Sequence, residues 1–173
     1  YIPSVIKQGT KVIVCEEFAN EMQRLNDLTI IQVENSRKAL AQISHNFNDN
    51  PTKDMKVIGI TGTNGKTTIT FILSKIFETA GYKTGIIGTT GIFYNGKSIT
   101  ATHTTPESKE LAKIFAKMKS DGIDIVFMEV SSHALVQHRA DCIQFNGGIF
   151  TNLTHEHLDY HKNMEAYRKI KSL

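Results

Sequence analysis

Runs of apolar residues along the chain alternate between the spacing of a strand and the spacing of a helix. Residues 56–60 are a short run rich in β-branched side chains, and apolar residues then recur three or four positions apart from Ile69 to Ala80. The first pattern predicts a strand, and the second predicts a helix over residues 67–80 with Gly81 in the position that commonly ends a helix. The chain therefore contains a strand that leads directly into a helix.

This alternation continues along the chain and indicates the fold class. Further strands are predicted at residues 83–89, 123–130 and 148–151. Thr105 and the proline after it have the pattern of a helix start, for a helix that ends near Gly122, and Asn163 is placed to cap a last helix. Strands that alternate with helices are typical of a parallel sheet, so we predict an α/β fold: a Rossmann-like, mostly parallel sheet with flanking helices.

One hairpin interrupts the alternation. Asn95 and Gly96 lie between short apolar segments at residues 92–94 and 98–100. Asn-Gly is the strongest short-range hairpin signal, because both residues readily adopt the positive φ that a tight hairpin turn requires. We therefore predict a hairpin that projects from the sheet.

The first part of the chain reads as a smaller strand-helix unit. Residues 11–15 and 29–33 are predicted strands, and Asn35 or Ser36 is placed to cap a helix over residues 37–47.

A boundary follows this unit. The stretch at residues 45–51 is rich in Asn and Asp and ends in proline, a composition that interrupts regular structure. We therefore predict one domain that ends at residue 50 and a second domain over residues 51–173.

Composition and charge narrow the class of protein. The chain has 173 residues, of which 40% are hydrophobic and 21% charged, as in soluble folded proteins. Its net charge of +3 is too small to indicate a nucleic-acid or membrane-surface partner, although small anions stay possible. Its 2 cysteines have no paired spacing and it has no apolar run that could span a bilayer, so we expect a cytoplasmic protein, and we expect a monomer. The chain also begins without Met and stops within a helical pattern, so we expect part of a longer protein.

A glycine-rich loop joins the strand at 56–60 to the helix that follows. Its residues are Gly62, Thr63, Asn64, Gly65, Lys66, Thr67 and Thr68. Glycines let backbone N–H groups turn toward a phosphate, and the helix start adds a partial positive charge. Lys66 would contact the outer phosphates of a nucleotide, and the Thr67 hydroxyl would bind Mg²⁺. The usual phosphate-loop pattern has glycine where this chain has Ile60, so we predict a variant nucleotide loop; a structural turn is the alternative.

Two further groups of polar residues follow predicted strands. Glu129 lies near the end of the apolar strand at 123–130, and ligands of open α/β sheets bind beyond the carboxyl ends of the strands. It is a candidate for Mg²⁺, or alternatively an ion-pair partner of a lysine. Residues 155–161 include three histidines, a Glu and an Asp. We favour one of these histidines facing Mg²⁺; a zinc site and a solvated polar loop are the alternatives.

At these residues the chain resembles the Mur ligase family, whose members form peptide bonds in cell-wall precursors with ATP. The matching segments are residues 61–68, 129–133 and 152–159. Residues 104–107, 131–139 and 159–161 are similar to the branch that adds the third amino acid, meso-diaminopimelate or L-lysine, to UDP-N-acetylmuramoyl-L-alanyl-D-glutamate. The resemblance implies that residues 1–50 are the last part of a UDP-binding domain, that residues 51–173 are an incomplete ATP-binding central domain, and that the C-terminal amino-acid-binding domain is absent.

The resemblance also implies the roles of individual residues. Lys66 would contact the ATP phosphates, and Thr67 and Glu129 would bind one Mg²⁺. His157 would bind a second Mg²⁺ together with Lys171, after CO₂ has converted that lysine to a carbamate. The residues implied to hold the dipeptide substrate are Thr104, Thr105, Ser131, Gln137 and Arg139, and His103 stands where the family pattern has Asn.

The mechanism implied by the resemblance transfers the γ-phosphoryl group of ATP to the glutamyl carboxylate, and the amino group of the third amino acid then attacks the acyl phosphate. Because the amino-acid-binding domain is absent, we expect residues 1–173 alone to lack ligase activity. Two alternatives stay open: a related amide ligase that extends folate with glutamate, and a non-catalytic nucleotide-binding module.

Overall fold

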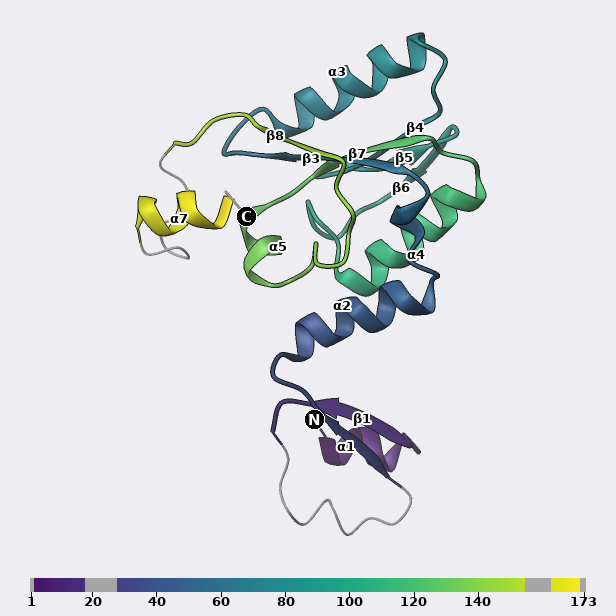
Figure 1. Cartoon of the computed structure of the whole chain (residues 1–173), viewed down its shortest axis with the longest axis vertical. Coiled ribbons are helices and arrows are strands. Elements are labelled where there is room, and N and C mark those ends of the chain that lie inside the picture. The colour runs from purple at the N-terminus through teal and green to yellow at the C-terminus, as the bar shows by residue number, and fades with distance from the viewer. Residues whose placement is uncertain (1, 18–27, 155–162, 172–173) are drawn as a thin grey trace.

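The computed structural model describes residues 2–17, 28–154 and 163–171. Most of them form one six-stranded sheet with helices on both faces (Figure 1). The strands are β3 (Lys56–Thr61), β4 (Thr84–Gly88), β5 (Gly91–Tyr94), β6 (Lys97–Ile99), β7 (Ile125–Glu129) and β8 (Gly147–Phe150), in the order β6-β5-β4-β7-β3-β8. Neighbours among β4, β7, β3 and β8 pair parallel. The predicted α/β fold with a mostly parallel sheet and flanking helices is thus confirmed.

The predicted hairpin forms, but it does not project from the sheet. β5 pairs antiparallel with β4, and β6 pairs antiparallel with β5, so the two strands extend the sheet at one edge. The reason is the burial of Ile92 at 0% and Tyr94 at 4% exposure, since these side chains need the core that the sheet provides. A projecting hairpin would leave them in water.

Two helices cover the two faces of the sheet. Helix α3 (Lys66–Thr79) packs Ile69, Leu73 and Phe77 against Ile60 and Phe127 on one face. Helix α4 (Ser108–Ser120) packs on the other face, where its apolar stripe enters the larger core. Figure 1 shows the two helices on opposite sides of the strands. The amphipathic spacing read from the sequence therefore identified α3 as a core-facing helix, although Ile72 and Ile76 of that spacing are 52% and 56% exposed.

The start of α4 differs from the sequence prediction. The helix begins at Ser108 with Glu107 at the cap position, two residues later than a cap at Thr105 requires. The Thr105 hydroxyl instead donates to the Glu129 carbonyl oxygen at 2.9 Å and accepts the Ser131 N–H at 3.0 Å. Because those partners hold Thr105 against the end of β7, it cannot cap the helix.

The N-terminal part forms a second, two-stranded sheet. Strands β1 (Val12–Cys15) and β2 (Thr29–Gln32) pair parallel, next to helix α1 (Ile2–Lys7), which the sequence did not predict. Helix α2 (Ser36–Phe47) follows, and Asn35 caps it by accepting the N–H groups of Arg37 and Lys38, both at 3.0 Å. Helix α2 contacts α4 and so joins this part to the larger sheet.

Helices α5 (Ser132–Val136) and α7 (Met164–Lys171) lie near the carboxyl ends of the parallel strands. The 3₁₀ turn η2 (Pro51–Lys53) lies at the opposite end, directly before β3. Within the described part of the chain, no helix has the length and apolar character that a membrane crossing requires.

Candidate functional site

The glycine-rich loop connects β3 to α3, as the sequence predicted. Gly62 has φ of +139° and Gly65 has φ of +85°, conformations that other residues adopt only with strain. A Cβ at Gly62 would lie 1.9 Å from Thr151 Oγ1, so this position also excludes a side chain by contact. Gly65 is at the cap position of α3 and has no side chain to bond the first N–H groups of the helix. Those groups therefore form an anion site of the kind that phosphate-binding loops use.

The segment after β8 fixes the conformation of this loop. Asn152 accepts the Asn64 N–H with its Oδ1 at 3.0 Å and donates from its Nδ2 to the Asn64 carbonyl oxygen at 3.1 Å. Thr151 donates to the same carbonyl oxygen at 2.7 Å, and the Thr63 N–H donates to the Asn152 carbonyl oxygen at 2.9 Å. Asn152 belongs to a segment that matches the Mur ligase family, but no local pattern predicts this contact, which joins residues 88 positions apart.

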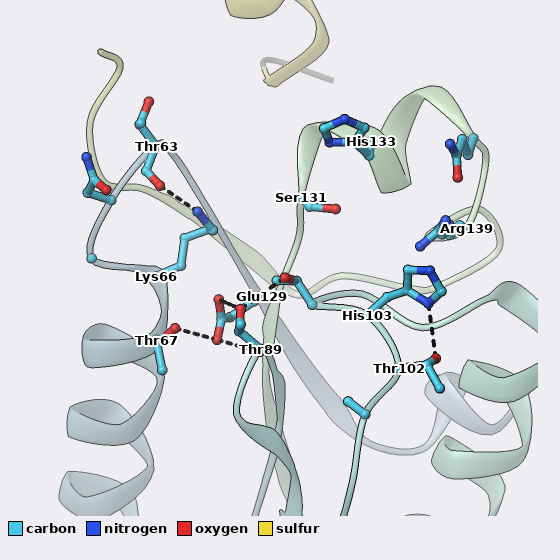
Figure 2. Close-up of a pocket in the computed structure, with 15 residues that line it drawn as sticks. Thr63, Lys66, Thr67, Thr89, Thr102, His103, Glu129, Ser131, His133 and Arg139 are labelled. Atoms are coloured by element: carbon cyan, nitrogen blue, oxygen red, sulfur yellow. Dashed lines mark hydrogen bonds between the residues drawn. The ribbon is translucent and has the colours of Figure 1, made fainter. Parts of the chain in front are cut away.

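Two lysines meet at the backbone of the loop. The Lys66 ammonium donates to the carbonyl oxygens of Gly62 at 3.0 Å and Thr63 at 2.6 Å (Figure 2). The Lys171 ammonium, from α7, donates to the same Gly62 oxygen at 2.8 Å and to Thr61 Oγ1 at 3.3 Å. Lys171 is only 7% exposed and lies 4.9 Å from the centre of the Tyr167 ring. The structure thus brings both predicted lysines to the phosphate loop.

Glu129 ends β7 at the centre of the site. It is 1% exposed, and its Oε1 accepts hydrogen bonds from Thr67 Oγ1 at 2.8 Å and from the Thr89 N–H at 3.1 Å (Figure 2). Its Oε2 accepts from Thr89 Oγ1 at 3.2 Å. Among the ion pairs of residues 2–17, 28–154 and 163–171, none joins Glu129 to a lysine or arginine. The ion-pair alternative for Glu129 is therefore not realised among the described residues. A bound cation would stabilise this buried carboxylate, because only neutral groups donate to it.

The composition of this group fits a hard divalent cation. Carboxylate and hydroxyl oxygens are the ligands that Mg²⁺ prefers, and Glu129 and Thr67 bring one of each to the same point. Gly88 leaves the space that the carboxylate fills, because a Cβ there would lie 2.2 Å from Glu129 Oε1. The residues present therefore fit Mg²⁺.

One cavity of about 680 Å³ connects the phosphate loop with most of the predicted substrate residues. Its lining includes Thr104, Ser131, Gln137 and Arg139, together with His103 and His133, on the side opposite the loop. Figure 2 shows Glu129 between Lys66 and Thr67 on one side and His103 and Arg139 on the other. A ligand in this cavity could thus contact the loop, the carboxylate and the polar residues in and beside α5 at once.

Two of the predicted substrate residues are already engaged by other protein groups. Arg139 Nε lies 2.9 Å from Glu107 Oε1, and its Nη1 donates to the Thr105 carbonyl oxygen at 3.0 Å. Thr105 itself is fully buried and does not line the cavity. Its hydroxyl instead joins the end of β7 to Ser131. Direct substrate binding by Thr105 stays a prediction that this placement does not favour.

The second predicted metal site is only partly within the described residues. His157 and the rest of the polar segment at 155–161 lie outside them, so the choice among magnesium, zinc and a solvated loop stays open. Lys171 is described, but it lines a separate cavity of about 380 Å³ with Phe145, Leu135 and the glycines of β8. Elsewhere in the described chain, no group of three or more His, Cys, Asp or Glu side chains is placed to hold a metal ion.

Comparisons with known proteins identify relatives of the chain. The model of the Mur ligase middle domain matches residues 60–173. The UDP-N-acetylmuramoyl-L-alanyl-D-glutamate--2,6-diaminopimelate ligase of Clostridium botulinum is 49% identical over 171 residues, and that of Cytophaga hutchinsonii is 47% identical over 173 residues. These matches cover 99% and 100% of this chain but 35% of each relative, so the chain spans about a third of their length.

Solved structures share the fold at lower identity. A UDP-N-acetylmuramoyl-L-alanyl-D-glutamate--2,6-diaminopimelate ligase superposes with a TM-score of 0.79 at 22% identity, over 98% of this chain and 34% of that one. A folylpolyglutamate synthase of Mycobacterium tuberculosis, complexed with ADP and AMPPCP, has a TM-score of 0.61 at 17% identity, over 78% of this chain and 38% of that one. Both likenesses concern the fold alone.

Proposed function

The chain belongs to the Mur ligase family, and from this premise we propose that it supplies the ATP-binding region of an ATP-dependent ligase of peptidoglycan precursor synthesis. The proposed reaction joins the glutamyl carboxylate of UDP-N-acetylmuramoyl-L-alanyl-D-glutamate to the amino group of a third amino acid. The names of the relatives at 47% and 49% identity favour 2,6-diaminopimelate over L-lysine as that amino acid.

A single observation carries this proposal. The phosphate loop, the buried Glu129 carboxylate and the polar residues Thr104, Ser131 and Gln137 line one cavity. ATP and a carboxylate substrate repel each other, so a ligase has to hold both negative groups side by side in one site. This cavity has an anion site at one end and hydrogen-bonding groups with the Arg139 guanidinium at the other, as that task requires.

In the proposed mechanism, the loop amides and Lys66 hold the phosphates of ATP while the polar residues across the cavity hold the substrate carboxylate in line. A carboxylate oxygen bonds to the γ-phosphorus, the bond to ADP breaks, and an acyl phosphate forms. The amino group then attacks the acyl carbon, loses a proton and displaces inorganic phosphate. Mg²⁺ bound by Thr67 and Glu129 would supply positive charge that neutralises the phosphates during transfer.

We further propose that His157 and a carbamylated Lys171 form a second metal site, as the family resemblance implies. The Lys171 nitrogen, which donates to the Gly62 carbonyl oxygen, would have to lose a proton to solvent before it could react with CO₂, because an ammonium has no lone pair. We also propose a domain boundary near residue 50, a cytoplasmic location and a monomeric state. Light scattering coupled to gel filtration tests the last of these.

The proposal predicts that Lys66 binds ATP directly. Lys66→Ala should weaken ATP binding by about 1.5–3 kcal/mol, or roughly 10- to 150-fold, because a charged hydrogen bond to phosphate is lost. Titration calorimetry of the chain with ATP and Mg²⁺ measures this. Lys75→Ala is the matched control, since Lys75 lies on the same helix with 79% of its side chain exposed. Equal affinities for the Lys66 and Lys75 variants would contradict the assigned role.

Ligase chemistry is tested in a chimaera. Residues 1–173 replace the matching third of the Cytophaga hutchinsonii relative, and phosphate release is measured with the UDP-muramoyl dipeptide and either 2,6-diaminopimelate or L-lysine. We expect release with 2,6-diaminopimelate from the chimaera and none from residues 1–173 alone. A chimaera that binds ATP and releases no phosphate with either amino acid would contradict the proposed reaction.

A further inference from the structure

Thr89 has a position that the sequence analysis did not consider. It is the first residue after β4 and lies in the turn that leads into β5. Its side chain is exposed to the cavity that holds the phosphate loop, and Figure 2 shows it directly beside the Glu129 carboxylate. A residue at the carboxyl end of a parallel strand is well placed to act on a ligand there.

Thr89 holds both oxygens of one carboxylate. Its N–H donates to Glu129 Oε1 at 3.1 Å, and its hydroxyl donates to Glu129 Oε2 at 3.2 Å. Two contacts from one residue fix the plane of the carboxylate, whereas a single contact would allow it to rotate about its last side-chain bond. Gly88 leaves room for the carboxylate, because any side chain at that position would overlap Glu129 Oε1.

The orientation of Glu129 determines how it faces Thr67. Oε1 is shared by the Thr67 hydroxyl and the Thr89 N–H, so the same oxygen that Thr89 fixes is the one that meets the start of α3. Thr67 and Glu129 would hold a divalent cation through the Thr67 hydroxyl and this oxygen, and the Thr89 N–H would keep the oxygen in place.

Thr89 also contacts the substrate side of the cavity. Its hydroxyl lies 3.0 Å from Thr104 Oγ1, as well as 3.2 Å from Glu129 Oε2. A hydroxyl has one hydrogen to donate, so the Thr89 hydroxyl donates either to Glu129 or to Thr104 at a given moment. When Thr104 donates to the Thr89 oxygen, the Thr89 hydrogen is directed to Glu129. Thr104, on the substrate side of the cavity, then helps to orient the Glu129 carboxylate through Thr89.

We propose that Thr89 is a positioning residue that orients Glu129 for the divalent cation of the nucleotide site and links it to Thr104. This inference rests on the proposed function. It adds a residue that acts through Glu129 rather than by contact with ATP. It also predicts a specific defect: loss of the Mg²⁺ dependence of nucleotide binding, with little loss of binding in the absence of the metal.

The test compares Thr89→Val, which removes the hydroxyl at constant shape, with Thr89→Ser, which keeps it. Titration calorimetry measures the affinity of the chain for ATP in EDTA and over a series of Mg²⁺ concentrations. Thr89→Val should leave the affinity in EDTA within about twofold and raise the half-maximal Mg²⁺ concentration about tenfold, the scale of one hydrogen bond to a charged group. Thr89→Ser should return that concentration to within about twofold of the unmodified chain. Thr90→Val is the matched control, because Thr90 is the exposed neighbour.

Two results would overturn the inference. One is an unchanged Mg²⁺ dependence in Thr89→Val, and the other is an equal loss of ATP affinity with and without Mg²⁺, which would indicate a structural role. Glu129→Gln provides a second test: in that background Thr89→Val should have no further effect, and additive losses would contradict action through Glu129. If the unmodified chain fails to bind ATP at all, the proposed function itself is wrong, so the two failures are distinguishable.

Discussion

At the scale of single residues, Gly62 determines whether the phosphate loop can form. Its backbone is in a region that favours glycine, and a Cβ would overlap Thr151 Oγ1 and approach the Asn152 N–H to 3.0 Å. Thr151 cannot simply turn away, since its hydroxyl donates to the Asn64 carbonyl oxygen. The loop and the segment after β8 therefore pack together only when residue 62 has no side chain.

Gly62→Ala should accordingly be more damaging than Gly65→Ala. Both variants place alanine at positive φ, which costs about 1 kcal/mol or more, but only at Gly62 does the new methyl group also overlap neighbouring atoms. We expect Gly62→Ala to weaken ATP binding at least tenfold and Gly65→Ala to weaken it less, as measured by titration calorimetry. Gly148→Ala is the control, because its Cβ would meet no atom within 4 Å. Equal losses at Gly62 and Gly65 would show that the overlap is relieved by movement.

Some residue roles could be predicted from the sequence and others could not. Asn35 as a helix cap and Gly81, with φ of +91°, as a helix end depend on residues a few positions away, so local pattern sufficed. The contact of Thr89 with Glu129 spans 40 positions, and that of Asn152 with Asn64 spans 88. Contacts at such separations arise only when the sheet brings strand ends together, so a single sequence does not contain their signal.

At the scale of elements, the order of the strands explains the site. β3, β7 and β4 are adjacent in the sheet, so the phosphate loop, Glu129 and Thr89 emerge side by side although the chain separates them. The sequence predicted each strand within a few residues, but it did not give this order or the antiparallel edge of β5 and β6. The predicted start of α4 was wrong for a related reason: the hydrogen bonds of Thr105 to residues at the end of β7 outweigh its local capping pattern.

The segment that follows β8 holds the phosphate loop in its conformation. Asn152 pairs with the main chain of Asn64 through both the oxygen and the nitrogen of its side-chain amide, so Asn152→Ala should loosen the loop and weaken ATP binding by roughly 1–2 kcal/mol. Asn152→Asp should weaken it further, because the carboxylate cannot donate to the Asn64 carbonyl and adds negative charge near the phosphates. Calorimetry with ATP measures both.

A control separates the role of Asn152 from that of the Asn64 side chain. Asn64→Ala keeps the main-chain groups that Asn152 contacts, so it should cost less than Asn152→Ala. A larger effect of Asn64→Ala would indicate that the Asn64 side chain, and not the contact from β8, is what the nucleotide requires.

At the scale of the whole molecule, helix α2 connects the small N-terminal sheet to the large one, and His45 lies in that connection. His45 is 0% exposed, and within the described part of the chain neither of its ring nitrogens has a hydrogen-bond partner. Burial lowers the pKa of His45 below its ordinary value, because a charged ring would lose its hydration. The folded protein therefore protonates this ring less readily than the unfolded chain, in which the ring gains a proton as the pH falls below about 6.5.

Because of this difference, the free energy of unfolding should decrease as the pH falls. The unfolded state binds more protons at His45, so the free energy of unfolding should fall between pH 7.5 and pH 5.5, by up to about 1 kcal/mol from this residue. Denaturant unfolding of the chain and of His45→Leu at both pH values measures it, and the decrease should be smaller in the variant. Exposed His103→Gln is the control and should retain the decrease of the unmodified chain. Asp54 and Asp121, whose pKa values lysine partners lower, lose their contribution only in more acidic solution and do not affect this window. An identical pH dependence in His45→Leu and the unmodified chain would contradict this prediction. It would mean that a hydrogen-bonding group or a water molecule stabilises the charged His45 ring in the folded protein.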